Sequence, residues 1–270
     1  MVDRPGTLFH RDGANRFVPT EWCRGPWDPD ALHAGSSSAL LAHLVDGHAS
    51  LSPMRIMRLS YDILRPVPLA PLDVELHVDR EGKRIQIVSA VLSADGVEVQ
   101  RLRALRMRRG DVSLPLDGPR SASLADVGLS PVEEMEEFGV PDLGDVVFFA
   151  HAMEMRATGL GLLSEPGPGA SWFRLRFPVV DDQEATPTAR VAATADFGNG
   201  LGPPVPFQGW IYLNADLQVM LQREPVDEWV GMVSSSIPAD DGTALTTSQL
   251  VDRSGQIGIA TQSLFIEPRT

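Results

Sequence analysis

Residues 186–202, TPTARVAATADFGNGLG, form the stretch around which the fold of this chain is organised. Thr186 followed by Pro187 is typical of a helix start, because the hydroxyl can cap the helix and proline lacks an N–H that the first turn leaves unpaired. The small residues that follow predict a helix that packs closely on a sheet, ended by Gly198 in the left-handed conformation. One acid, Asp196, lies in the last turn, where the helix dipole disfavours a negative charge. This position suits a general base, and it equally suits a carboxylate that faces solvent.

The composition describes an ordinary globular protein. The chain has 270 residues, of which 43% are hydrophobic and 22% are charged, so it is long enough for one large or two modest domains. A net charge of −13 argues against binding to a nucleic-acid backbone, which needs a basic surface. Cys23 is the single cysteine, which excludes a disulfide framework and a cysteine-based metal site.

The sequence contains no signal for a membrane or for export. No apolar run approaches the roughly 18 residues that a membrane-spanning helix needs. Residues 1–17 lack the charged and then apolar layout of a signal peptide. We therefore expect a soluble cytoplasmic protein. The six histidines are scattered without helical ligand pairs, so no metal is expected.

The same order of elements is predicted in both halves of the chain. The first half begins with an entering strand, followed by a helix that we expect Asp30 to cap and that ends near Gly47. Asp95-Gly96 is a strong signal for a tight hairpin. In the first half the predicted strands are 14–27, 54–64, 72–78, 84–92 and 97–107. In the second half they are 146–155, 171–177, 207–221, 229–236, 244–250 and 256–266, with the alanine-rich helix after the second of them.

Two pairs of landmarks indicate an internal repeat. Pro66 and Pro225 each close a strand, and the offset between their sequence numbers is 225 − 66 = 159. Gly96 and Gly255 each lie in a hairpin, and their offset is the same, 255 − 96 = 159. A repeat this long with two copies indicates duplicated domains. Each copy is a central helix with an antiparallel sheet, an α+β architecture.

We expect an N-terminal domain in residues 1–110, a connector in 111–145 and a C-terminal domain in 146–270. The connector is rich in proline, glycine, serine and acidic residues, and we expect it to contain one helical turn.

With these motifs in this order, the chain resembles the double-hotdog acyl-CoA thioesterases, and specifically the bacterial acyl-CoA thioesterase II-like family. In the first half the resemblance rests on GPW, on LHAG at the start of the helix and on a strand ending in LRP. In the second half it rests on ATAD, on NADLQVMLQREP and on DRSGQIGIATQSL. The resemblance covers about residues 17–268 apart from the connector. It implies two tandem hotdog folds, each a central helix wrapped by an antiparallel β-sheet.

The resemblance also implies a site. The family's catalytic Asp, its Thr, Ser or Asn, and its Gln fall on Asp196, Asn214 and Gln262 of this sequence, with the active site in the C-terminal domain. Without the resemblance, the two amide residues are ordinary polar strand residues. For substrate binding we expect His33 and Gly35 at the start of the first helix, and Arg103 from an arginine-rich strand that could meet the phosphates of coenzyme A.

The chemistry of thioester hydrolysis is compatible with these residue types. The leaving thiolate has a pKa of about 8.5, so no strong general acid is required. A carboxylate and two amide side chains can hold and deprotonate a water without a covalent step. Backbone N–H groups at a helix N-terminus, for example in residues 33–36, can stabilise the oxyanion. No cofactor is expected, and coenzyme A enters as part of the substrate.

The repeat predicts one active site per chain. Subtracting 159 from the residue numbers of Asp196 and Gln262 gives Ser37 and Arg103, and neither is an acid.

The expected binding partner is a small-molecule acyl-CoA. We expect no nucleic-acid partner and no membrane span, and a homodimer is an open alternative. Two other functions also stay open. A protein that binds acyl-CoA without turnover would keep the fold, whereas a hotdog enoyl-CoA hydratase would need a histidine soon after its Asp, and residues 197–207 contain none.

Overall fold

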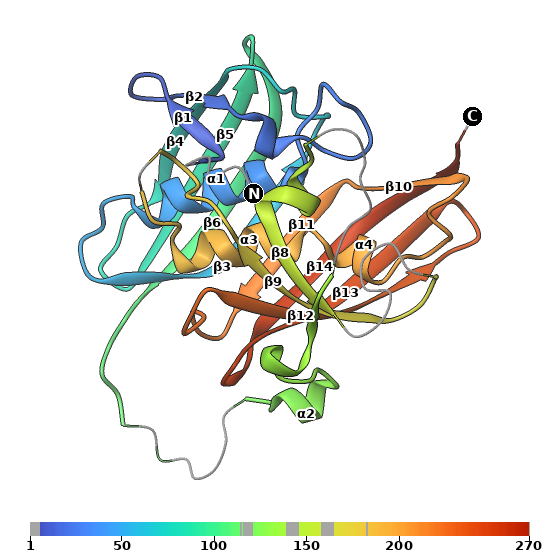
Figure 1. Cartoon of the computed structure of the whole chain (residues 1–270). Coiled ribbons are helices and arrows are strands. Elements are labelled where there is room, and N and C mark those ends of the chain that lie inside the picture. Colours follow the sequence, from blue (N-terminus) through green and yellow to red (C-terminus); the bar gives the residue numbers. More distant parts are fainter. Residues whose placement is uncertain are drawn as a thin grey trace.

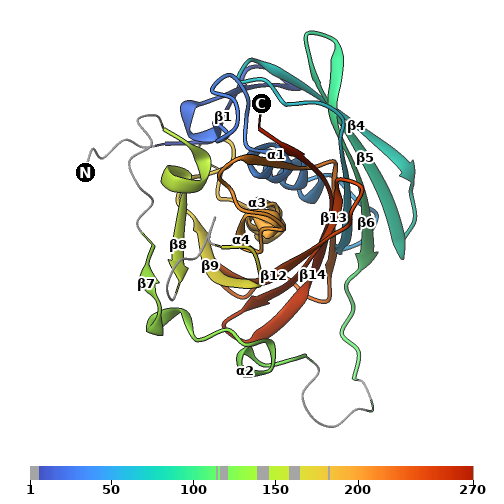
Figure 2. The ribbon, with the colours of Figure 1, turned by 90° about the vertical axis from the view of Figure 1, so that its right-hand side faces the viewer.

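The structure is a computed structural model, and it describes residues 6–113, 115, 121–138, 146–157, 165–181 and 183–269. Antiparallel strands curve around two central helices, which Figure 1 shows from the side and Figure 2 nearly along the second helix. No helix in these ranges is long and apolar enough to cross a membrane.

The first half of the chain forms an antiparallel sheet around helix α1 (Ala34–Asp46). Its main strands are hydrogen-bonded in the order β4-β5-β6-β3. The predicted hairpin between β5 and β6 is confirmed, since Asp95 has a φ of 48° and Gly96 a φ of 76°, as a tight turn of this kind requires. The elements of this half are β1 (Phe9–Arg11), β2 (Arg16–Pro19), η1 (Glu21–Cys23), β3 (Met54–Ile63), β4 (Leu72–Arg80), β5 (Ile85–Ala94) and β6 (Val97–Arg108).

The second half forms a similar layer around helix α3 (Pro187–Ala195), followed by the short helix α4 (Gly198–Leu201). Its strands are hydrogen-bonded in the order β11-β14-β13-β12-β9-β8-β7, and β10 also pairs with β14. They are β7 (Glu136–Glu137), β8 (Met153–Ala157), β9 (Gly169–Leu175), β10 (Trp210–Asn214), β11 (Asp216–Leu221), β12 (Trp229–Pro238), β13 (Thr243–Asp252) and β14 (Gly255–Pro268).

The two halves join into one continuous sheet. Strand β3 pairs antiparallel with β11, with Leu59 opposite Val219 in the register. Inside the sheet, α1 packs against α3. A Cβ atom at Gly35 would lie 2.9 Å from the backbone oxygen of Ala193, so the glycine allows the start of α1 to approach the end of α3. This approach brings the ends of the two helices together.

The predicted start of the second helix is confirmed. Thr186 is the N-cap of α3, and its hydroxyl accepts a hydrogen bond from the N–H of Ala189 at 3.2 Å. Pro187 is the first helical residue. Val191 and the alanines of this helix are fully buried, which agrees with the close packing that their small size predicted.

Both predicted helix boundaries that involve Asp30 and Gly198 are wrong. The N-cap of α1 is His33, because residues before it form a turn in which the Asp28 side chain accepts from the N–H of Asp30 at 2.9 Å. Helix α3 ends in a right-handed cap at Asp196, and Gly198 begins α4. A Cβ at Gly198 would lie 2.6 Å from Oε1 of Gln262, so close packing explains this glycine.

Three predicted strands are interrupted. The predicted strand 14–27 is present only as β2, which ends at Pro19, and residues 21–23 form the single helical turn η1. Residues 148–152 form a π-helical turn, η3 (Phe148–Ala152), which directs the consecutive residues Phe148 and Phe149 into the core. Alternation in a strand would have placed them on opposite faces. The predicted strand 207–221 is divided into β10 and β11 at Ala215, whose N–H bonds to Ser263 of β14.

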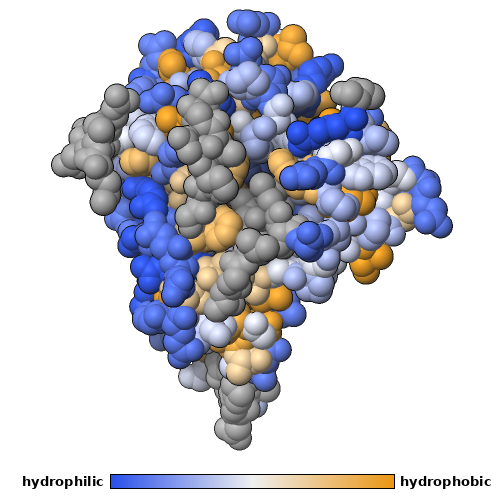
Figure 3. All heavy atoms as spheres, turned by 45° about the vertical axis from the view of Figure 1, so that its right-hand side comes forward, coloured by the Kyte–Doolittle hydropathy of each residue, from blue (hydrophilic) through white to orange (hydrophobic). Residues whose placement is uncertain are grey.

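The described part of the connector packs on the second half. It contains α2 (Leu124–Val127) and η2 (Val132–Glu134), the helical turn expected there. Apolar residues of this segment cover Trp172 and Trp229. Residues 114, 116–120 and 139–145 of the connector lie outside the described residues. Figure 3 shows one face of the molecule, where hydrophilic residues lie along the lower left side, the top and the right, and hydrophobic residues lie in small groups between them.

Candidate active site

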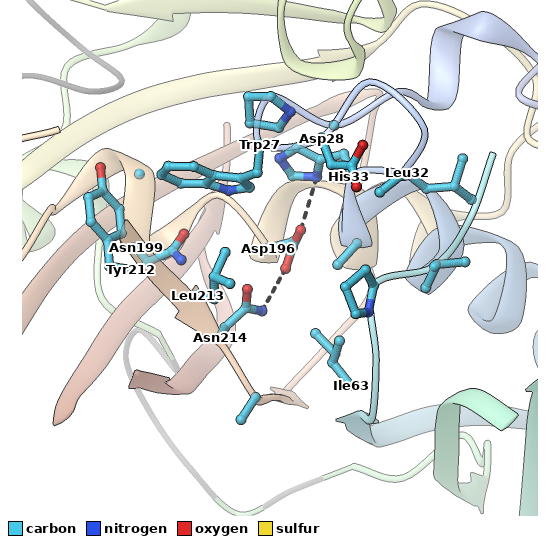
Figure 4. Close-up of a pocket in the computed structure, with 18 of the residues that line it drawn as sticks. Trp27, Asp28, Leu32, His33, Ile63, Asp196, Asn199, Tyr212, Leu213 and Asn214 are labelled. Atoms are coloured by element: carbon cyan, nitrogen blue, oxygen red, sulfur yellow. Dashed lines mark hydrogen bonds and ion pairs between the residues drawn. The ribbon is translucent and has the colours of Figure 1, made fainter. Parts of the chain in front are cut away.

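A pocket of about 380 Å³ lies at the C-terminal end of α3, between residues of the two halves. The first half lines it with the loop before α1 and with the end of β3. The second half lines it with the α3–α4 corner and with β10. Most of the lining side chains are apolar, whereas Asp196, His33 and Asn214 meet at one place in the wall (Figure 4). The pocket therefore combines an apolar enclosure with one polar centre.

The carboxylate of Asp196 is the middle of this centre, and the residue is 4% exposed. Its Oδ1 accepts a hydrogen bond from Nδ2 of Asn214 at 2.9 Å. Its Oδ2 lies 3.0 Å from Nδ1 of His33. The carboxylate thus has a polar partner on each oxygen, contributed by β10 and by the turn before α1. Its orientation is fixed toward the pocket, as a base that must hold a water requires.

The ring of His33 connects Asp196 to the N-terminus of α1. Its Nδ1 also lies 3.0 Å from the backbone nitrogen of Gly35. One ring nitrogen cannot accept from Gly35 and donate to Asp196 at the same time. When Nδ1 is protonated and donates to an ionised Asp196, the Gly35 N–H is left for another acceptor. Phe148 and Phe197 hold the ring, with centroids 5.1 and 4.8 Å from it.

Gln262 lies behind the carboxylate and contacts the backbone of the α3–α4 corner. Its Nε2 donates to the backbone oxygen of Asp196 at 3.2 Å, and its Oε1 accepts from the N–H of Asn199 at 2.9 Å. The side chain is 1% exposed and is not among the residues that line the pocket. The structure thus brings Asp196 and Asn214 into direct contact and places Gln262 where it supports the corner that carries Asp196.

The three residues expected to bind substrate lie in different places. His33 lines the pocket, and Gly35 lies behind it against α3. Arg103 lies on the outer face of β6, where its Nε is 3.3 Å from the Asp79 carboxylate, and it does not line the pocket. Its neighbours Leu102 and Ala104 are buried, so the alternation of the strand turns Arg103 outward.

Most other arginines of this strand also have partners away from the pocket. Arg101 pairs with Glu98, and Arg109, which directly follows the strand, pairs with Glu224. Arg106 is buried and donates to the Gln86 side chain at 2.6 Å and to the backbone of His48. Arg65, which follows β3, is the arginine that lines the pocket, and it was not expected from the sequence.

Local sequence patterns also provided no reason to select the aromatic residues at one end of the pocket. Trp27 lies 5.7 Å from Tyr212 in an edge-to-face arrangement and 5.3 Å from Phe207. The Arg269 guanidinium lies over both Trp27 and Phe207. Trp27 ends the predicted strand 14–27 and belongs to the GPW motif, and Tyr212 lies within the predicted strand 207–221, so local pattern could not bring them together.

The hydroxyls of Ser36 and Ser37 and the thiol of Cys23 are occupied by structural contacts. The Ser36 hydroxyl donates to the backbone of His33 at 2.8 Å, and the Ser37 hydroxyl donates to Ala34 at 3.1 Å. Burial raises the pKa of Cys23 to about 12, and its thiol donates to Leu8. A thiol with this pKa stays protonated near neutral pH and is a poor nucleophile.

The register of the sheet corrects the expected equivalence of the two halves. Leu92 pairs with Gln100 and Leu250 pairs with Gly258, so the offset between the hairpins is 258 − 100 = 158 and not 159. Gln262 therefore corresponds to Ala104, which is 262 − 158, and not to Arg103.

The helices give a different equivalence from the one that the repeat predicted for Asp196. In helix α1, His43 lies 43 − 33 = 10 residues after the N-cap residue His33. In helix α3, Asp196 lies the same number of residues, 196 − 186 = 10, after the N-cap residue Thr186. Asp196 therefore corresponds to His43, and not to Ser37.

Several solved structures resemble this chain over nearly its whole length. A conserved protein of unknown function with a hotdog fold from Alicyclobacillus acidocaldarius matches 98% of this chain and 98% of its own, with 15% identity and a TM-score of 0.69. A candidate thioesterase from Novosphingobium aromaticivorans gives 96% and 98% coverage, 19% identity and a TM-score of 0.69. The acyl-CoA thioesterase II TesB2 of Mycobacterium marinum gives 97% and 96% coverage, 14% identity and a TM-score of 0.62.

Family models match both halves of the sequence. The acyl-CoA thioesterase N-terminal domain matches residues 23–107, and the acyl-CoA thioesterase C-terminal domain matches residues 126–266. The chain therefore belongs to the acyl-CoA thioesterase family, and its fold is a hotdog-type α+β fold. No curated protein sequence matches it.

Proposed function

We propose that this protein hydrolyses acyl-CoA thioesters to a free acid and coenzyme A by direct attack of a water molecule. The observation that carries the proposal is the buried Asp196 carboxylate, held between His33 and Asn214 in the wall of an apolar pocket. An apolar enclosure suits an acyl group, and an oriented carboxylate suits a base.

In the proposed mechanism Asp196 accepts a proton from the attacking water, and Asn214 fixes the carboxylate that holds this water. Gln262 acts as a positioning residue, because both of its hydrogen bonds go to backbone groups beside Asp196. The water oxygen forms a bond to the thioester carbon, and the C–S bond then breaks to release the thiolate. The low basicity of a thiolate makes a separate acid unnecessary.

The negative charge on the carbonyl oxygen needs donors, and the N-terminus of α1 supplies them. Ala34 lines the pocket at the start of this helix. The N–H of Gly35 lies behind the pocket wall and is directed at His33 Nδ1, so in this mechanism the ring moves aside, with its Nδ1 proton on Asp196, for this N–H to reach the oxyanion. Backbone N–H groups at the positive end of a helix stabilise such an oxyanion. His33 thereby couples the charge of the base to the donor for the oxyanion.

We further propose that the two halves are tandem hotdog domains, residues 1–110 and 146–270, with the active site in the second and a connector in 111–145. A central helix in each half and the pairing of β3 with β11 support this division. The packing of residues 121–138 on the second half attaches this part of the connector to the C-terminal domain.

A thiol-release assay with saturated acyl-CoAs from acetyl to palmitoyl tests the proposal. We expect turnover of at least one of them, with no acyl group attached to the protein by mass spectrometry after a rapid quench. Binding without thiol release would identify an acyl-CoA binding protein and overturn the proposal. An acyl adduct on Ser36, Ser37 or Cys23 would overturn the direct attack by water.

A further inference from the structure

A second hollow lies on the outer face of the sheet, where the two halves of the chain join. It is a groove of about 490 Å³, and none of its lining residues lines the pocket that contains Asp196. The groove crosses β6, β3, β11 and β14, which are neighbours in the sheet (Figure 1). Its lining residues are Met57, Arg58, Leu105, Met107, Met220, Leu221, Gln222, Gln256, Gly258 and Ile259.

The strand register explains why these side chains gather. Arg58 of β3 lies opposite Leu105 on one side and opposite Met220 on the other. Met220 in turn lies opposite Ile259. Val219, which precedes Met220, is fully buried, so the alternation of the strand turns Met220 outward. One outward row therefore crosses four strands, over about 14 Å at about 4.8 Å between neighbours.

The apolar side chains of the groove are exposed to solvent. Met107 is 38% exposed, Met220 54% and Ile259 43%. Large apolar side chains that gather on a surface mark a binding site, whereas single ones need no explanation. The unbranched side chains of Met57, Met107 and Met220 can adapt their shape to an apolar ligand.

Arg58 is the one charged residue in the lining of the groove. Its Nε is shielded from solvent and has no hydrogen-bond partner in the described part of the chain. The two terminal nitrogens also have no partner among the described contacts, and they are not shielded, so a ligand can reach them. Arg101 and Arg103 of the neighbouring strand β6 are both paired with carboxylates. Arg58 is thus a cation without a described carboxylate partner, in a chain with a net charge of −13.

We propose that this groove binds a fatty acid, with its alkyl chain on the row of apolar side chains and its carboxylate on the terminal nitrogens of Arg58. A guanidinium matches a carboxylate through two parallel N–H donors, and no acid in the lining repels the ligand. A second copy of this chain would instead bring another net charge of −13 to the same face. The inference concerns a site apart from Asp196, so it stands or falls independently of the proposed hydrolysis.

Methyl NMR can locate the ligand, because methionines line this groove and none lines the pocket of Asp196. The full chain is labelled with carbon-13 at the methionine methyl groups and titrated with decanoate. Each signal is assigned by replacing one methionine with leucine. We expect saturable shifts of the Met57, Met107 and Met220 signals. Shifts confined to other methionines, or no shifts, would overturn the inference.

The role of the charge is tested with 1-decanol, which has the same chain length and no carboxylate. We expect 1-decanol to bind at least about 10-fold more weakly than decanoate. Arg58→Gln should weaken the binding of decanoate by about 10-fold and remove its preference over 1-decanol. The matched control is Arg103→Gln, an outward arginine of β6 that does not line the groove, and it should bind decanoate as the wild type does. Equal affinities of the wild type for the two ligands would overturn the inference.

Met220→Glu provides a second test should Arg58→Gln fail to fold. Met220 is 54% exposed and lies opposite Arg58, so an acid is tolerated there and can pair with the guanidinium. We expect decanoate binding to fall by at least about 10-fold with an unchanged circular dichroism spectrum. Undiminished binding would contradict the proposal. Methionine signals of the groove that shift with protein concentration, together with a dimer in analytical ultracentrifugation, would show that a second copy covers this face and would also overturn it.

Discussion

The groups around Asp196 fix the orientation of its carboxylate. Among the described contacts, no lysine or arginine forms an ion pair with it. Asn214 donates to one oxygen, and the His33 ring lies against the other. A neutral amide orients a carboxylate without neutralising it, so Asp196 keeps the capacity to accept a proton. This arrangement distinguishes the residue from a carboxylate in an ordinary structural ion pair such as that of Arg223 and Asp252.

Replacing Asp196 by Asn keeps the shape of the side chain and removes the proton acceptor. We expect kcat for thiol release to fall by about 10²-fold or more, with an unchanged circular dichroism spectrum. The control is Asp62→Asn, since Asp62 is an exposed acid at the edge of the same region. Turnover of Asp196→Asn within a few-fold of the wild type would remove the residue from the proposed mechanism.

Asp46 is the last residue of α1, and its carboxyl should make the stability of the fold depend on pH. Burial raises the pKa of its carboxyl above the unfolded value of 3.8, opposed by a hydrogen bond from Thr186 and reinforced by the charge of Glu224. A raised pKa means that the folded state favours the protonated acid, so the contribution to stability is present below pH 3.8 and is lost as the pH rises through the folded-state pKa.

Asp46→Asn should therefore raise Tm at neutral pH, and the gain should disappear below about pH 4, where the wild-type acid is protonated in both states. Thermal unfolding followed by calorimetry across this range is the measurement, with the exposed Asp240→Asn as the control. A variant that is less stable than the wild type at pH 7 would show that the charge on Asp46 stabilises the fold.

At the scale of elements, the corner between α3 and α4 depends on β14. Gln262 projects from this strand and bonds backbone groups on both sides of the corner, and Gly198 makes room for it. Asp196 is at this corner, so its position depends on a strand that is distant in the sequence. Thr186 fixes the other end of the same helix.

Gln262→Ala should reduce both stability and turnover, because it leaves the partly buried N–H of Asn199 and the carbonyl of Asp196 without their partners. We expect a loss of about 1–3 kcal/mol in the free energy of unfolding, measured by urea denaturation. We expect kcat to fall by about 10- to 10²-fold. The control Gln249→Ala changes an exposed glutamine on the neighbouring strand β13. An unchanged kcat in Gln262→Ala would exclude the positioning role.

At the scale of the whole molecule, the two halves share an architecture and differ in their polar residues. The residue equivalent to Gln262 is Ala104, and the residue equivalent to Asp196 is His43, whose Nε2 lies 3.0 Å from Oε1 of Gln183. Arg106, further along β6, is buried near this end of α1 and donates to the backbone of Asp46 at 3.4 Å. At the end of α1, the polar residues thus make structural contacts, whereas the end of α3 carries the Asp196 carboxylate.

This asymmetry predicts one active site per chain. Titration with the thioether analogue of the best acyl-CoA substrate should give one equivalent bound per chain in calorimetry, and Asp196→Asn should abolish all thiol release. Two equivalents per chain, or residual turnover at half the wild-type rate in Asp196→Asn, would reveal a second functional site in the first half.

The sequence by itself determined the elements whose signals are local. The Thr186-Pro187 start of α3 and the Asp95-Gly96 hairpin are confirmed, because caps and tight turns depend on the conformations of a few adjacent residues. Two predictions about local conformation were wrong because packing against distant residues decided it. Gly198 is required by contact with Gln262 and not by a left-handed cap, and residues 148–152 turn to bury two adjacent phenylalanines.

The site was decided by the tertiary structure. Asp196 was selected from the sequence, but its contact with His33 joins two distant parts of the chain through the close packing of α1 on α3. The register of the sheet decided that Arg103 faces outward and that Gln262 bonds the backbone. Sequence patterns act over one or two turns of chain, whereas these contacts depend on the pairing of β3 with β11, which brings the two halves of the chain around one pocket.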